Sequence, residues 1–474
     1  MKRRESFRLI PLSLAGMATM VNKAFSEDLL RYDYPNVDAY REPEKPTGEP
    51  LAIRYTKKVR DRLLWVRETQ SENLLEASYA IARTVMRKGT CWYFYELGHT
   101  PEFDIFPERN GLPEIFTMGY NPEKSKDGDL FLVSVAGALH EDLKKKDILV
   151  IGAPCSYTGD ALGSHLIVLE HAKRQIRPYS DIWIEYNIDT IDALMRVPGM
   201  PAPIGVVGGT IGIVTFWMMV ADACRVLARE GKPVNVRGDE PKLSGKDIPW
   251  VSLHDPLMDD YFEQTLLQIE MIGAEMGNIN RIAKMAVDSV LAGGRVWCYS
   301  RYYDSLAAEA STRIGGLSLT QGIYVKDGKL SLEESDFKGT SKDLVIMGIF
   351  EPDDEVDLKS LDTFRELGMK VASMGPMTRD IKIPVGRTVP KEADIHVGRM
   401  CDTYGLYAIP GFERKVAPTS GVLLTQIFYA TVMEIVEEMI RRTGNIPGVF
   451  FSAALRGGRE HMYRMHEIYR ERGY

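Results

Sequence analysis

The chain has 474 residues, of which 45% are hydrophobic and 26% are charged, and its formal net charge is −7. These values are typical of globular proteins, and the length allows two or three domains. With no large basic excess, a nucleic-acid-binding surface is not expected. The five cysteines lie far apart without a CxxC pair, which argues against a disulfide framework and against structural zinc.

Residues 1–25 combine a basic start with a modestly apolar run. Arg3 and Arg4 precede Phe7, and this pattern is similar to a twin-arginine export signal. The alternative is a basic helix at the start of a cytoplasmic protein, and the periplasmic location is favoured slightly. No stretch reaches the roughly 20 apolar residues of a membrane span, so no transmembrane segment is expected.

Residues 26–57 are polar and proline-rich, which predicts an arm or linker. Apolar residues at helical spacing then predict a helix over 58–88, and an apolar run predicts a strand over 91–95. The further elements expected in this half are strands at 129–135, 147–152 and 181–185 and helices at 162–174 and 204–230. Such alternation predicts a parallel, doubly wound α/β domain, here 58–237.

Residues 238–260 contain scattered prolines and charges and are expected to form a linker. A second domain, 261–474, shows the same alternation of apolar runs. Its expected elements are a helix over 261–291, strands at 296–300, 343–350, 368–374 and 394–397, and a final helix over 420–442.

The two halves of the chain repeat one sequence pattern at a nearly constant offset. Residues 89–112 run through a glycine, an aromatic strand, a polar loop and an Arg-x-Gly, and three of these residues recur 204 positions later as Gly293, Arg313 and Gly315. The run 343–350 similarly matches 147–152. A repeat of about 200 residues has the length of a domain, which indicates a duplicated α/β domain.

Several motifs together resemble a known family. Gly98-His99-Thr100, followed by Arg109-Asn110-Gly111, is similar to the opening of sugar isomerase (SIS) domains in a phosphosugar-isomerase-like branch. Residues 155–162 (CSYTGDAL) resemble the S-x-S-G-x-T turn that cradles sugar phosphates in these domains. Residues 417–463 resemble the closing segment of that branch. The matches cover most of 58–236 and 261–474.

The resemblance implies two tandem three-layer αβα domains with flavodoxin-like parallel sheets and a cleft between them. It further implies an isomerase that acts on a carbohydrate or sugar phosphate through an enediol. We expect no cofactor, no metal and no nucleic-acid partner, and we expect a homo-oligomer. A module that binds a carbohydrate derivative without catalysis is the main alternative, and a carbohydrate-active lyase or hydrolase is a further one.

Aldose–ketose isomerisation needs a base beside the sugar and an acid or cation near the carbonyl oxygen. Glu96, His99 and Glu102 follow the first strand, where the ligands of open α/β sheets gather. They are the candidates for proton transfer. A capped loop with solvated charges would have the same composition.

A phosphate is held by backbone N–H groups at a helix N-terminus and by hydroxyl groups. The candidate ligand-binding residues are Gly98, Thr100, Arg109, Ser156, Thr158, Gly159, Arg313, Thr419, Ser420, Arg456, Glu460 and His461. Some of them have an alternative role. Thr419 and Ser420 can cap a helix, Arg109 and Arg313 can form structural ion pairs, and residues 456–461 can form a subunit interface.

The corresponding turn of the second half, residues 351–355, carries four acids. Four carboxylates would repel a phosphate, so a second phosphate site is not expected there. One composite pocket, built from both halves, is therefore expected rather than two equal ones.

Overall fold

The computed structural model describes most of the chain between residues 48 and 450. The candidate export signal and most of the predicted arm lie outside the described residues, which are 48–94, 100, 104–105, 112–134, 138–154, 158–159, 166–167, 176–188, 193–198, 200, 203–237, 242–244, 248–312, 315–332, 337–398, 402–450, 464–465 and 467–469.

The first domain is built on a parallel five-stranded sheet. Its strands have the order β2-β1-β3-β4-β7, which is the flavodoxin-like order 2-1-3-4-5. The bounds are β1 Cys91–Phe94, β2 Phe116–Met118, β3 Leu130–Val133, β4 Leu149–Gly152 and β7 Ile182–Trp183. The apolar runs at β1, β3 and β4 are buried, as expected for strands covered on both faces.

The second domain contains a six-stranded sheet with the order β10-β9-β8-β11-β12-β13. Without the antiparallel edge strand β10, this is again the order 2-1-3-4-5. The bounds are β8 Val296–Tyr299, β9 Thr320–Lys326, β10 Lys329–Ser331, β11 Leu344–Gly348, β12 Lys370–Met374 and β13 Ile395–Val397. The protein is therefore an α/β protein with two parallel sheets of one topology.

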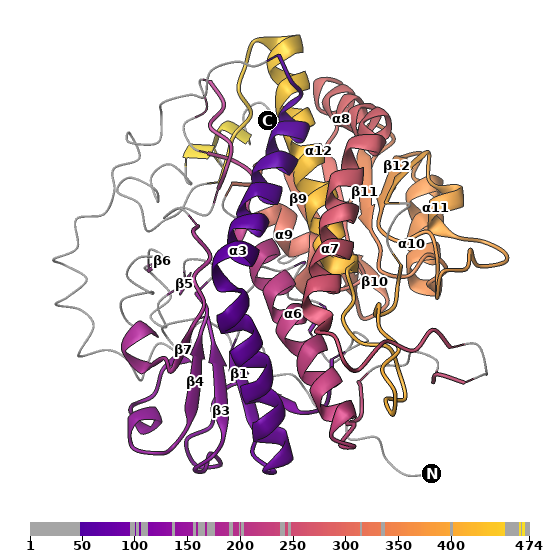
Figure 1. Ribbon diagram of the computed structural model, residues 1–474. Coiled ribbons are helices and arrows are strands. Elements are labelled where there is room, and N and C mark those ends of the chain that lie inside the picture. The colour runs from indigo at the N-terminus through magenta and orange to yellow at the C-terminus, as the bar shows by residue number, and fades with distance from the viewer. Residues whose placement is uncertain are drawn as a thin grey trace, which may run out of the picture.

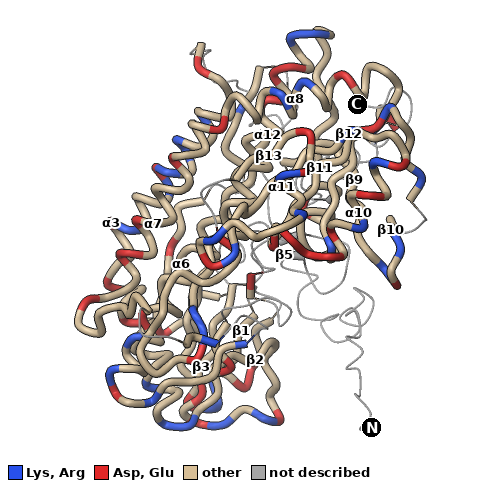
Figure 2. The backbone as a smooth tube through the Cα atoms, turned by 90° about the vertical axis from the view of Figure 1, so that its right-hand side faces the viewer, with Lys and Arg blue, Asp and Glu red and all other residues tan. Residues whose placement is uncertain are grey.

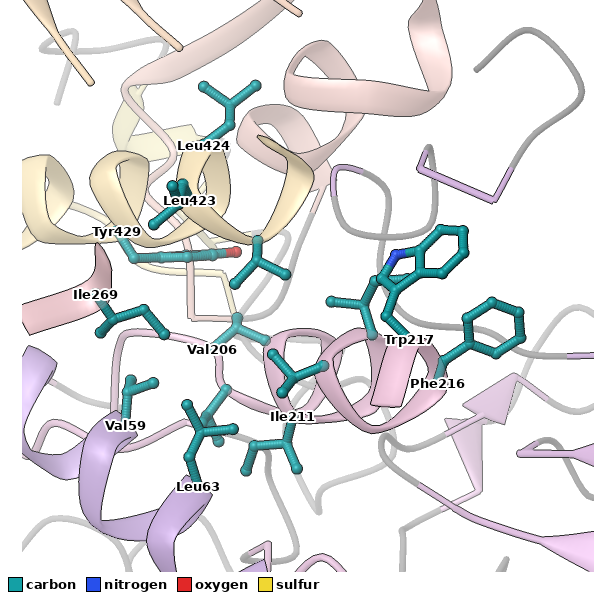
Figure 3. Packing of buried hydrophobic residues seen from close by; sticks show 14 of the residues in the cluster. Val59, Leu63, Val206, Ile211, Phe216, Trp217, Ile269, Leu423, Leu424 and Tyr429 are labelled. Atoms are coloured by element: carbon teal, nitrogen blue, oxygen red, sulfur yellow. The ribbon is translucent and has the colours of Figure 1, made fainter. Parts of the chain in front are cut away.

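The main helices lie between and beside the two sheets (Figure 1). The long ones are α3 Leu51–Met86, α6 Gly208–Arg229, α7 Leu257–Glu270, α8 Met276–Leu291, α10 Glu355–Glu366 and α12 Ser420–Thr443. The short elements are η3 Glu141–Lys144, β5 Thr158–Gly159, β6 Leu166–Ile167, η4 Arg177–Tyr179, η5 Met271–Glu275, η6 Tyr303–Ala307, α9 Ala308–Thr312 and α11 Val389–Glu392. Side chains of α3, α6, α7 and α12 meet in one continuous core between the sheets (Figure 3).

Helix α3 faces this core on one side and solvent on the other. Its charged residues are mostly basic between Arg54 and Arg67 and acidic between Glu68 and Glu76 (Figure 2), whereas Tyr55, Val59 and Leu63 are buried. The helix begins at Leu51, inside the predicted arm, because its first turn contacts both domains. The Tyr55 hydroxyl donates to the carbonyl of Val206, and the N–H of Ala52 donates to Glu434 of α12.

Two predicted helices differ from the structure. The helix expected over 261–291 is two helices, α7 and α8, separated by the 3-10 turn η5. The helix expected over 162–174 is wrong at Leu166–Ile167, which form strand β6 and pair antiparallel with β5. The backbone N–H and C=O groups of β6 pair with β5 across the hairpin, so this apolar run needs no helix to satisfy its backbone hydrogen bonds.

One helix in the described part of the chain, α6, is long and apolar enough to span a membrane by composition alone. Of its most apolar window, 94% is buried inside the protein. Burial between the two sheets accounts for the apolar composition of α6, so this composition is weak evidence for a membrane span.

The same aspartate–tryptophan contact begins both sheets. The indole N–H of Trp92 donates to Asp129 at 2.9 Å, and that of Trp297 donates to Asp343 at 3.0 Å. In both cases the other carboxylate oxygen accepts the backbone N–H two residues before the tryptophan. Trp297 lies 205 positions after Trp92, so the two first strands are equivalent at an offset of 205 rather than 204.

The glycines preceding these strands agree with that offset. Lys88 and Gly293 both have a positive φ, 62° and 78°, at the end of the preceding helix. A Cβ on Gly89 would lie 2.7 Å from the carbonyl oxygen of Gly128, just before β3. A Cβ on Gly294 would lie 2.3 Å from the carbonyl oxygen of Lys342, just before β11. Gly89 therefore corresponds to Gly294, and the predicted pairing with Gly293 is wrong by one residue.

The predicted match between 147–152 and 343–350 is also wrong. Strand β11 pairs with β8 just as β3 pairs with β1, whereas β4 lies one strand farther out. The counterpart of β11 is thus β3. The acidic turn after β11 consequently corresponds to the segment that follows β3 at Ser134, and residues 155–159 follow a different strand.

Replacing Asp343 with asparagine is expected to lower the free energy of unfolding by about 1–3 kcal/mol, because one acceptor oxygen becomes a donor that faces an N–H group. Asp343 is buried and also accepts the N–H of Thr340. Urea unfolding measures the change, with the exposed Asp327→Asn as the matched control. Equal losses in both variants would contradict the assigned role.

Candidate functional site

The loop after β1 reaches the second domain. The candidate catalytic residues of this loop, Glu96, His99 and Glu102, lie outside the described residues, as does Gly98. Thr100, from the same loop, is fully buried, and its backbone N–H donates to the Glu309 carboxylate at 3.3 Å. Through Thr100, this loop therefore contacts the second domain.

Asp104 extends that contact to the N-terminus of α12. Its Oδ2 accepts the N–H of Gly421 at 2.8 Å, and its Oδ1 lies 3.4 Å from the Ser420 hydroxyl. A Cβ on Gly421 would lie only 2.4 Å from Oδ2, so glycine is required for this approach. A buried carboxylate at a helix N-terminus is stabilised by the helix dipole.

The capping predicted for Thr419 and Ser420 is corrected by this arrangement. Thr419 occupies the N-cap position and is buried, but its side chain makes no capping hydrogen bond. The carboxylate of Asp104, which comes from the other domain, accepts the first-turn N–H instead. The N-terminus of α12 is thereby occupied by an anion that belongs to the protein.

Glu309 is the counterpart of Asp104 in the second domain. It lies 205 positions later, is 1% exposed, and accepts the Tyr429 hydroxyl at 2.6 Å as well as the N–H of Thr100. Each of the two equivalent carboxylates thus accepts a backbone N–H from the other domain. The result is a buried polar junction between the domains.

A hydroxyl residue stands four positions before each of these acids. Thr100 precedes Asp104 and Ser305 precedes Glu309, and both hydroxyl residues are fully buried. Neither hydroxyl oxygen has a hydrogen-bond partner among the residues that the structure describes. Buried hydroxyls normally have partners, so both are available to a group that enters the junction.

Helix α7 closes one side of the junction through Tyr261. Its hydroxyl donates to the carbonyl of Pro418 at 2.9 Å, directly before α12. Burial, and then the nearby Asp104 carboxylate, raise the pKa of Tyr261 well above its ordinary value. Tyr261 therefore remains a neutral hydrogen-bond donor at physiological pH.

The acids of the turn after β11 are paired within the second domain. Asp354 caps α10 by accepting the N–H groups of Val356 and Asp357, and it pairs with Arg301 from the loop after β8. Glu351 and Asp353 pair with Arg379. The N-terminus of α10 is thus occupied by a carboxylate of the protein itself.

Asp357, in the first turn of α10, has a strongly perturbed pKa. Burial, followed by the neighbouring Asp354 carboxylate, raises the pKa of Asp357 to about 8. The hydroxyl of Tyr299 donates to it at 2.8 Å, and the Ser360 hydroxyl donates to Tyr299 at 3.0 Å. Sequence reasoning did not single out this residue, although buried groups with shifted pKa values often mark functional sites.

The other predicted ligand-binding residues are mostly not placed. Thr158 and Gly159 form strand β5 of a short hairpin, so the predicted strand-to-helix turn is wrong at these two residues. Those that lie outside the described residues are Arg109, Ser156, Arg313, Arg456, Glu460 and His461.

No group of three or more His, Cys, Asp or Glu side chains in the described ranges is arranged to hold a metal ion. Cys91, Cys224 and Cys298 are free and buried. Burial raises the pKa of the Cys91 thiol to about 12. These cysteines are therefore unreactive core residues.

No family model and no curated protein matches the chain. Among solved structures, it is similar to a proposed phosphosugar isomerase from Clostridium difficile (11% identity, 86% of this chain, 97% of that chain, TM-score 0.44). It is also similar to tagatose-6-phosphate ketose/aldose isomerase from Escherichia coli (11%, 86% and 96%, TM-score 0.39). A third is the C-terminal domain of glucosamine-fructose-6-phosphate aminotransferase from Francisella tularensis (13%, 81% and 97%, TM-score 0.36). The contacts between the two domains, rather than these distant likenesses, carry the proposal below.

Proposed function

We propose that the protein binds a sugar or sugar derivative at the junction of its two domains and isomerises it by enediol-type acid–base chemistry. The supporting observation is the pair Asp104 and Glu309, which are equivalent in the two domains and each accept an N–H group from the other one. The loops that bear them follow β1 and β8, the first strand of each sheet. Ligands of open α/β sheets bind at these strand ends.

The proposed proton-transfer groups are Glu96, His99 and Glu102, which belong to the same loop as Thr100 and Asp104. The contacts of Asp104 with α12 fix the end of this loop, so Asp104 acts as a positioning residue. The hydroxyls of Thr100 and Ser305, which have no partner among the described residues, would bind sugar hydroxyl groups. Arg109 and Arg313 would bind an anionic substituent, if the sugar carries a phosphate.

A non-catalytic module that binds a carbohydrate derivative is the second candidate. The observation that favours it is the turn after β11, in which Asp354, Glu351 and Asp353 are already paired with arginines. With these acids engaged in ion pairs, the second domain offers fewer groups for proton transfer, and binding at the junction can occur without turnover.

The test screens the purified full-length chain by thermal shift against fructose 6-phosphate, glucose 6-phosphate and the free sugars, and then assays isomerisation of each ligand that binds. We expect Glu96→Gln, His99→Asn and Glu102→Gln to retain ligand stabilisation, and we expect at least one of them to lower kcat by about 10²–10⁴-fold. The matched control is Glu141→Gln, an exposed position of the first domain.

The outcomes separate the two candidates. Stabilisation of the wild type by a sugar that it also turns over, with turnover reduced in at least one of these variants but not in the control, supports the isomerase. Stabilisation without turnover of any sugar supports the binding module. If no sugar raises the melting temperature, both are overturned.

A further inference from the structure

A groove of about 700 Å³ lies on the outer side of the second domain. It is formed by α10, the β9–β10 hairpin and the loop after β8, on the face of the sheet where Tyr299, Val345 and Phe364 pack. The opposite face, with Val296 and Leu344, belongs to the core that contains α12. The groove is therefore separate from the junction between the domains, and its volume lies within the range of about 300–1,000 Å³ that is typical of small-molecule sites.

The charged residues that line this groove are all basic. They are Arg301 after β8, Lys329 on β10 and Lys359 on α10, and no acid lines the groove among the described residues. Arg301 is neutralised by Asp354. Within the described part of the chain, neither lysine forms an ion pair, so two positive charges are left to attract an anion.

The groove also offers a flat surface beside these charges. The Arg301 guanidinium lies over the ring of Tyr302, 5.1 Å from its centroid, and both residues line the groove. Arginine and tyrosine planes bind the flat faces of nucleobases. The hydroxyls of Ser360 and Thr363 and the side chains of Val325 and Leu330 complete a lining that is mixed in polarity.

We propose that this groove binds a nucleoside monophosphate or a similarly sized molecule with one phosphate and one planar ring. The phosphate is held by Lys329 and Lys359, and the ring lies against the surface of Arg301 and Tyr302. A doubly charged phosphate matches the two lysines, which have no acidic partner among the described residues, and the aromatic side of the groove gives the ring a place that inorganic phosphate alone cannot use. The site is independent of the proposed sugar site.

The test titrates the full-length protein with adenosine 5′-monophosphate, adenosine and inorganic phosphate by calorimetry at low ionic strength. We expect adenosine 5′-monophosphate to bind more tightly than either of the other two. We expect Lys329→Glu combined with Lys359→Glu to raise its Kd at least about tenfold, since two attractive charges become repulsive. Tyr302→Ala is expected to raise the Kd for the nucleotide and to leave that for inorganic phosphate unchanged.

The matched control combines Lys124→Glu with Lys382→Glu, two exposed lysines outside the groove that give the same change in net charge. Because all four lysines are exposed, folding should survive, and circular dichroism checks it. The proposal is overturned if the wild type does not bind the nucleotide, if the groove and control variants lose affinity equally, or if nucleotide and inorganic phosphate bind alike.

Discussion

Asp357→Asn is expected to make the protein more stable than the wild type at alkaline pH, by up to roughly 5 kcal/mol. The folded-state pKa of Asp357 is about 8, against an ordinary value of 3.8. The folded chain therefore holds a proton that the unfolded chain releases between these two pH values. The stabilising contribution is complete below about pH 4 and is lost as the pH rises to about 8. Asparagine keeps the bond from Tyr299 and has no proton to lose.

Urea unfolding of both proteins at intervals from pH 4 to pH 9 measures this effect. The difference between variant and wild type should grow with pH up to about 8 and then remain constant. Glu434, whose pKa burial raises to about 7, is present in both proteins and cancels in the difference. Parallel stability curves for the two proteins would show that Asp357 titrates normally.

Asp222→Ala is expected to destabilise the protein by about 3–5 kcal/mol, because it leaves a buried guanidinium without its partner. Asp222 and Arg225 on α6 are 0% and 1% exposed and pair at 2.7 Å. Asp222 also accepts the N–H of Leu257, and Arg225 donates to the carbonyl of Leu253. The pair thus holds the segment before α7 against the core.

The denaturation midpoint of Asp222→Ala in urea is compared with that of Glu230→Ala, which breaks the exposed pair with Arg229 on the same helix. The control should change stability by less than about 1 kcal/mol. Combining Asp222→Leu with Arg225→Met should recover much of the loss, because no unpaired charge remains. A small effect of Asp222→Ala, comparable to the control, would mean that water reaches Arg225.

The fold was predicted where strands are buried on both faces. Continuous apolar runs identified β3, β4 and β11, because parallel strands under helices carry few polar residues. Strands β9 and β10 were missed, since β10 is the edge strand, β9 lies beside it, and their partly exposed residues lack such a run. The break between α7 and α8 was missed because apolar spacing continues through η5, where Ile272 is buried.

The sequence indicated only some of the residues that lie at the junction between the domains. Thr100, Thr419 and Ser420 do lie at the junction, but Asp104 and Glu309 were not recognised. The available signal was a hydroxyl residue four positions before an acid in both halves. The more conspicuous glycines hide this signal, because an alignment of the two halves on Gly89 and Gly293 is one residue out of register. In polar loops, hydrogen bonds to another domain cannot be inferred from spacing alone.

The contact between Asp104 and Gly421 makes each domain depend on the other for buried hydrogen bonds. The first domain supplies the anion that completes the N-terminus of α12, and the second supplies the carboxylate that accepts the N–H of Thr100. Each half would therefore expose an unsatisfied, formerly buried polar group if it were separated from the other. Although the chain contains two sheets of the same topology, we therefore expect it to unfold as one cooperative unit.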